Sequence, residues 1–148
     1  MQIVRLYYYN PSVVSDELYA PSCGLDARVN SYNAYVANSV KFLVKSRDDR
    51  CQTQNCEIVS AGTHAGIKEH YYGYLEDSIE LVYIKNNRVS LFKCKWFDMD
   101  PRRKHVIYKP CYNSIDTSRE AYKEYPFVFA TQVRQVYYID NPNKSNTN

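Results

Sequence analysis

The strongest structural signal in this sequence is an alternation of apolar and charged residues near the middle of the chain. Phe92, Cys94 and Trp96 are separated by single lysines. Successive side chains of a β-strand point to opposite faces, so this pattern predicts a strand with one face toward a core and the other toward water.

The alternating strand has a partner immediately before it in the sequence. Residues 74–84 are a second β-like segment, and residues 85–88 between the two contain Asn86 and Asn87. Asparagine tolerates positive φ, which suits a two-residue type I′ turn. The sequence therefore predicts a β-hairpin, with Ile79, Leu81 and Tyr83 on one face of its first strand and Glu80 on the other.

The remaining segments complete a mainly β pattern of five or six strands. Further strands are expected at residues 40–45, 57–61 and 126–140, loops at 46–55, 62–70 and 98–109, and single helical turns at 15–24 and 118–125. Hairpin connections imply an antiparallel sheet, which in a chain of 148 residues buries one face by curling into a small barrel or packing as a sandwich. We expect a mainly β fold with little helix, of SH3-like or bromo-adjacent-homology-like type.

The chain divides into three parts on composition. Residues 1–16 form a strand or poorly ordered lead-in, residues 17–140 a single β-rich domain, and residues 141–148 a frayed Asn-rich tail. No stretch approaches the roughly 18–20 apolar residues that a membrane span needs, and the N-terminus has no signal-peptide pattern. We expect no membrane association.

Known catalytic and nucleotide-binding motifs are absent from the sequence. There is no GxGxxG, GxxxxGK[ST], GxSxG or HExxH. A metal-dependent nuclease needs several acidic residues together, and the candidates for such a site are Glu76, Asp77, Glu80, Asp98 and Asp100. The spacing of Cys51, Cys56, His64 and His70 is a weak match to a zinc site, because it lacks a CxxC pair. We expect no catalytic residues, no metal and no cofactor.

Positive charge is concentrated in one segment. The net charge is +3, whereas residues 85–109 contain eight basic and two acidic residues, a balance of +6. Such a cluster can neutralise nucleic-acid phosphates. The candidate phosphate contacts are Lys93, Lys95, Arg102, Arg103 and Lys104. The alternative is a solvated hairpin face next to a basic loop.

Tyrosine is unusually abundant, with 16 residues. Tyr71 and Tyr72 precede the hairpin, and exposed tyrosines near cations can stack on nucleobases or enclose a methylated lysine. Trp96 would be a third ring for such a cage, but its place beside Phe92 and Cys94 predicts a core position. The alternative is that the adjacent tyrosines split between the two faces of a strand.

Several short motifs in order resemble a plant family. They are Thr-Gln-Asn at residues 53–55, Tyr-Gly-Tyr-Leu-Glu at 72–76, Leu-Phe-Lys-Cys-Lys-Trp at 91–96, and Pro126-Phe127 followed by Ala130, Gln132 and Gln135. Over residues 17–142 the chain resembles the domain of unknown function that lies C-terminal to the transposase in CACTA (En/Spm-type) transposon proteins. The family pattern has Asn-Gly where this chain has Asn38-Ser39.

The resemblance implies a nuclear, transposon-derived protein with a non-catalytic accessory role in nucleic-acid binding or complex assembly. The partners it implies are DNA, through phosphate contacts, and transposase or chromatin proteins. The order of hairpin, Trp-Phe-Asp, basic loop and final strand also resembles bromo-adjacent-homology domains, so a chromatin or protein-interaction module is the alternative. A metal-dependent nuclease is a third possibility.

Overall fold

The computed structural model describes residues 25–64, 66–83, 86–103, 106–124 and 126–140. The strand expected at residues 3–9, the helical turn at 15–24, the lead-in 1–16 and the tail 141–148 lie outside these ranges. The described elements are β1 (Leu25–Tyr32), β2 (Ala34–Ala37), β3 (Val40–Leu43), α3 (Lys45–Asp48), β4 (Glu57–His64), β5 (Ile67–Tyr83), β6 (Arg88–Phe97), η2 (Pro101–Arg103), β7 (Val106–Tyr108), β8 (Asn113–Ile115), β9 (Glu120–Ala121), β10 (Phe127–Phe129), η3 (Ala130–Gln132) and β11 (Val133–Gln135).

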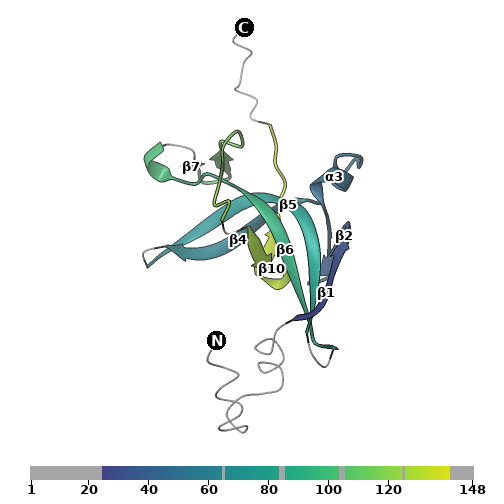
Figure 1. Ribbon diagram of the computed structural model, residues 1–148. Helices are drawn as coiled ribbons and strands as arrows, with labels where there is room; N and C mark the ends of the chain where they lie inside the picture. The colour runs from purple at the N-terminus through teal and green to yellow at the C-terminus, as the bar shows by residue number, and fades with distance from the viewer. Residues whose placement is uncertain (1–24, 65, 84–85, 104–105, 125, 141–148) are drawn as a thin grey trace.

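Seven of these strands form one antiparallel sheet, which confirms the mainly β prediction with little helix. Its order is β10-β6-β5-β4-β11. The long strand β5 pairs with β6 along one edge, and along its other edge with β4 first and β1 afterwards. Figure 1 shows β5 and β6 as long curved arrows that run side by side through the molecule. The path is open, because β10 and β11 end it, so a sandwich-like arrangement describes it better than a closed barrel.

The core lies on the inner face of this sheet, where the β2–β3 hairpin covers it. Phe92 is fully buried, and its ring makes edge contacts with Phe42 at 5.2 Å and Tyr35 at 5.6 Å between centroids. Cys94 and Trp96 are buried beside it, as the alternation predicts. Buried aliphatic and aromatic side chains of this kind each contribute about 1.5–3 kcal/mol to folding.

A β-bulge in β5 changes which residues face the core. The pairing of β5 with β6 shifts between Leu75 and Asp77, and both Leu75 and Ser78, three positions apart, are fully buried. A bulge inserts one extra residue into a strand and so reverses the alternation beyond it. Ile79 and Leu81 consequently lie on the outer face of the sheet.

Several local predictions are wrong. The described residues form eleven strands rather than five or six, and the expected loops at residues 46–55 and 98–109 contain part of α3 and the short strand β7. The expected loop at residues 62–70 belongs to a hairpin, in which β4 and β5 pair as far as His64 and Ile67 and Gly66 adopts a φ of 78°. This stretch lacks apolar alternation because both of its faces are largely solvated, so its strands were not visible in the sequence. The expected helical turn at 118–125 contains the short strand β9, which the end of β6 pairs with.

The predicted two-residue turn between β5 and β6 is also wrong. The hairpin itself is confirmed, and Asn86 has a positive φ of 58°. The strands end at Tyr83 and Arg88, however, and Tyr83 N donates to Asn87 O at 2.7 Å, so the connection is longer than a two-residue turn. Within the described part of the chain, no helix is long and apolar enough to cross a membrane.

Candidate functional site

The two predicted lysines lie on the outer face of β6 and are paired with carboxylates. Lys93 Nζ is 3.0 Å from Glu76 Oε2, and Lys95 Nζ is 3.9 Å from Glu76 Oε1 and 3.8 Å from Glu120 Oε1. These carboxylates raise the pKa of Lys95, after the larger effect of the Tyr74 hydroxyl. Glu76 directly follows the inward-facing Leu75, so it points to the outer face, where the two lysines lie.

The predicted arginines lie in η2, apart from the lysines, and are also paired. Arg102 Nε is 3.1 Å from Asp100 Oδ1, and Arg103 is 3.6 Å from Asp98 and 3.7 Å from Asp100. Hydrogen bonds from Arg102 hold the pKa of Asp100 below its ordinary value. Lys104 lies outside the described residues. The described members of the predicted set therefore form two charge-balanced clusters, in which four cations face four carboxylates.

Tyr71 and Tyr72 point to opposite faces of β5. Tyr71 packs against the core, with its ring 5.4 Å from that of Tyr122 and its hydroxyl donating to Glu69 at 3.3 Å. Tyr72 is on the outer face and accepts a hydrogen bond from Asn113 Nδ2 at 2.8 Å. Trp96 is in the core, so these three rings do not form a common aromatic cage.

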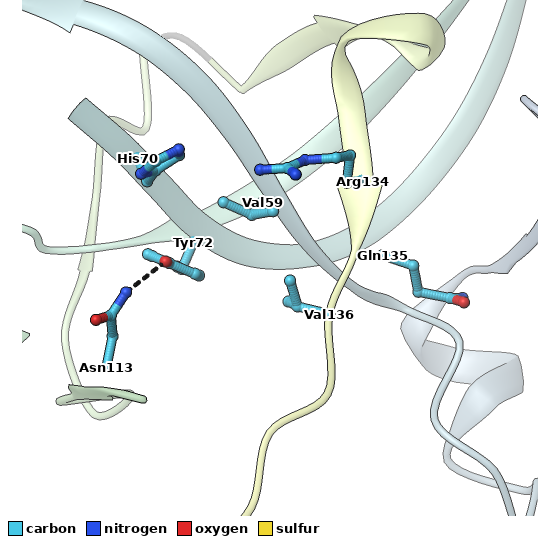
Figure 2. A pocket seen from close by; sticks show the side chains of 7 residues that line it. All are labelled: Val59, His70, Tyr72, Asn113, Arg134, Gln135 and Val136. Atoms are coloured by element: carbon cyan, nitrogen blue, oxygen red, sulfur yellow. Dashed lines mark hydrogen bonds between the residues drawn. The ribbon is translucent and has the colours of Figure 1, made fainter. Parts of the chain in front are cut away.

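Tyr72 lines a pocket of about 270 Å³ at the junction of β4, β5 and β11 (Figure 2). Figure 2 shows His70 and the Arg134 guanidinium beside Val59, with Asn113 bonded to Tyr72 nearby. In the described ranges, no carboxylate lies within ion-pair distance of Arg134. Arg134 is thus an exposed cation in the same pocket as the rings of His70 and Tyr72. The sequence did not suggest Arg134 as a binding residue, because this arginine lies outside the basic segment 85–109.

A second, larger hollow of about 580 Å³ lies over the arginine cluster. Tyr71 and Tyr122 contribute rings to it, and Asp98, Asp100, Arg102 and Arg103 contribute both signs of charge. Glu69 adds a third carboxylate, so the lining carries three carboxylates and two guanidinium groups and does not favour an anion.

The outer face of the sheet carries a contiguous set of apolar side chains, here called the apolar face. Cross-strand registers form one row of Val29, Leu81 and Val89 and a second row of Ile79, Leu91 and Phe129, each residue beside the next. Phe127 and Phe129 on the edge strand β10 are 52% and 49% exposed. The members are Val29, Ile79, Leu81, Val89, Leu91, Phe127 and Phe129. Exposed apolar sets of this kind mark interaction surfaces.

The residues considered for a metal site are not brought together as their spacing suggested. Cys51 is exposed and donates to Arg47 O at 3.7 Å, whereas Cys56 is buried. The acidic residues considered for a nuclease are spread over separate ion pairs. One group of three potential ligands does occur among the described residues, namely Asp48, Cys56 and Glu57.

The motifs that carry the family resemblance have structural contacts. Gln135 Nε2 donates to Lys41 O and Asn55 O, each at 3.0 Å, which ties β11 to the β3 region. Gly73 lies so close to β6 that an added Cβ would be 2.1 Å from Lys95 O. Tyr138 Oη donates to Gly73 O at 2.8 Å. These motif residues therefore make contacts that connect distant parts of the fold.

Comparison with known proteins gives one similarity. Residues 79–147 match a protein family described as Domain of unknown function (DUF4216). The match includes β6, β10 and β11, and with them most of the apolar face. No curated protein and no solved structure matches the chain. Over this C-terminal part, the chain is similar to a family whose function is itself undefined.

Proposed function

We propose that this chain is a non-catalytic accessory module of a CACTA-type transposase or of a transposon-derived nuclear protein, and that it serves complex assembly through the apolar face. The partner is a protein with a complementary apolar surface. The observation that carries this proposal is the exposure of Phe127 and Phe129 on the edge strand β10, where Phe129 continues the cross-strand row of Leu91 and Ile79.

Two physical arguments support assembly over phosphate neutralisation. Burying one exposed phenylalanine side chain is worth about 1.5–3 kcal/mol, so two of them can form the centre of an interface. The four predicted phosphate contacts that the structure describes, in contrast, are balanced by carboxylates within 4.0 Å, which reduces the local attraction for a polyanion.

The edge strand gives the partner a second means of attachment. In the described part of the chain, β10 pairs with β6 on one side only. An edge strand offers unpaired backbone N–H and C=O groups, to which an extended segment can add. A partner strand with apolar side chains could form hydrogen bonds with the backbone of β10 and also pack against the apolar face.

The test is a binding titration between this chain and a CACTA-type transposase lacking the module. The double variant Phe127→Asp/Phe129→Asp should weaken binding by at least about tenfold, since charge would be placed in an apolar contact. Ile139→Asp is the matched control, because Ile139 is 89% exposed and is not in the apolar face. Unchanged binding by the double variant, or no binding by the wild type, contradicts the proposal.

DNA binding is the second candidate, and the pocket around Arg134 favours it. A guanidinium that pairs with no carboxylate of the described residues, and that lies beside Tyr72 and His70, suits a phosphate next to a stacked base. Fluorescence anisotropy with duplex and single-stranded DNA tests it over a range of salt concentrations. Binding through phosphates must weaken steeply with salt and must fall in Arg134→Ala. Absence of binding at low ionic strength excludes this candidate.

A further inference from the structure

Asp48, Cys56 and Glu57 form a buried cluster at the junction of α3 and β4. One ligand atom from each lies within 4.8 Å of the other two, and all three side chains are buried. Two carboxylates and a thiol at this separation are an unfavourable combination in a low-dielectric environment unless a cation or proton compensates them.

Glu57 provides a second, independent observation. It is only 7% exposed, and its Oε2 atom is buried without a hydrogen-bond partner. Leaving a buried acceptor unsatisfied costs about 1–3 kcal/mol, and more when the group is charged. The backbone of Glu57 is held in place, since its carbonyl accepts from Val136 N at 3.0 Å. The unpartnered oxygen therefore belongs to a buried side chain on a strand whose backbone is held in place.

Asp48 is oriented in the way that metal-binding carboxylates usually are. Its oxygens accept hydrogen bonds from Asn55 N, Asn55 Nδ2 and Cys56 N, at 2.9–3.2 Å. A carboxylate offers about four acceptor positions, and these three donors together with the Cys56 thiol fill them, so a bound cation would take the place of the thiol proton. Ligating carboxylates are commonly held by such outer hydrogen bonds.

The nearest compensating charge is already engaged elsewhere. Lys45 Nζ pairs with Asp49 at 2.6 Å. Its pKa is raised first by that hydrogen bond, and also by the nearby Cys56 and Glu57. Burial, followed by a hydrogen bond to Asp48, raises the pKa of the Cys56 thiol.

We propose that Asp48, Cys56 and Glu57 bind one divalent cation of the zinc class, with Glu57 Oε2 as a ligand. One thiolate with two carboxylates matches zinc better than magnesium or calcium, which prefer oxygen alone. Zinc bonds of roughly 2.0–2.3 Å place neighbouring ligand atoms less than 4 Å apart, so small side-chain rotations suffice. On binding, the Cys56 S–H bond breaks, a metal–sulfur bond forms, and one proton passes to the solvent.

Cobalt(II) titration of the full chain under reducing conditions tests this site. We expect a thiolate-to-cobalt charge-transfer band that saturates at one equivalent and disappears on addition of zinc. Cys56→Ser should abolish the band, while Cys51→Ser, at an exposed thiol outside the cluster, should leave it intact. Circular dichroism establishes that each variant is folded.

Glu57→Gln keeps the thiol and the size of the side chain, and so remains informative if Cys56→Ser does not fold. It should retain the band but weaken cobalt binding roughly tenfold or more, because even outer partners of metal ligands contribute on this scale. The absence of a band in the wild type, or a band that survives Cys56→Ser, overturns the proposal. Unchanged affinity in Glu57→Gln also overturns it.

Discussion

Gln54 and Tyr138, 84 residues apart in the sequence, exchange two hydrogen bonds. Gln54 Nε2 donates to Tyr138 O at 3.0 Å, and Tyr138 N donates to Gln54 Oε1 at 2.9 Å. One glutamine side chain thus pairs with a backbone group in the manner of a neighbouring strand. The contact fastens the segment after β11 to the loop before β4, and it places the Tyr138 hydroxyl over Gly73.

Removal of the hydrogen bonds between Gln54 and Tyr138 should destabilise the protein. A net hydrogen bond contributes about 0.5–1.5 kcal/mol, so Gln54→Ala should lower the free energy of unfolding by about 1–2 kcal/mol. Urea denaturation measures the change. Gln52→Ala is the control, because Gln52 is exposed and has no described partner. Equal stability of the two variants would mean that the Gln54–Tyr138 contact contributes nothing in solution.

Gly73 should not tolerate a side chain. An alanine Cβ at this position would lie 2.1 Å from the carbonyl oxygen of Lys95, so β5 and β6 would have to separate. We expect Gly73→Ala to lower the free energy of unfolding by about 1–3 kcal/mol or more. At Gly62 the nearest obstacle is the ring of Tyr71, which can move, so Gly62→Ala should have a smaller effect. Thermal unfolding measures both effects. The midpoint of Gly73→Ala should be lower than that of Gly62→Ala, and the reverse order would contradict the prediction.

Ser39→Gly should stabilise the β2–β3 hairpin. Ala37 pairs with Val40, so Asn38 and Ser39 form a two-residue turn, and their φ angles are 51° and 64°. Glycine adopts positive φ without the steric penalty that serine has, and Asn-Gly is the preferred type I′ pair. The gain should be about 0.5–1 kcal/mol in urea denaturation.

The same substitution at Ser46 is the control for the turn. Ser46 lies in α3, where glycine is unfavourable, so Ser46→Gly should lower stability slightly. A loss of stability in Ser39→Gly would contradict the conformational explanation of this turn.

The hairpin of β5 and β6 could be predicted because its alternation is strong and local. Phe92, Cys94 and Trp96 point inward as the sequence indicates. The bulge at Glu76 could not be predicted, because it is fixed by pairing between strands rather than by local composition. It turns Ile79 and Leu81 outward, and so creates the apolar face that the sequence did not reveal.

The carboxylates that pair with the predicted phosphate-binding lysines could not be predicted from the sequence either. Lys93 and Lys95 were expected to be free for phosphates, yet Glu76 and Glu120 reach them from β5 and β9. Such pairs depend on register and on contacts between distant segments. The cluster of Asp48, Cys56 and Glu57 has the same origin, since α3 folds back on the start of β4.

Alkaline pH should weaken the fold through its buried acidic groups. Burial raises the pKa of Cys94 above its ordinary value of 9.0, and likewise that of Tyr138 above 10.0. The unfolded chain therefore loses these protons at a lower pH than the folded chain. The stability linked to Cys94 is complete below about pH 9 and declines as pH rises from there toward the folded pKa.

For Cys94 this decline is on the order of 1 kcal/mol per pH unit above pH 9. The measurement is the urea unfolding free energy at pH 7.5, 9 and 10 in the wild type and in Cys94→Ala. The variant is less stable at every pH because it leaves a cavity, but its pH slope should be shallower. Parallel slopes would mean that Cys94 ionises as readily in the folded chain as in the unfolded one, contrary to its burial behind Phe92 and Trp96.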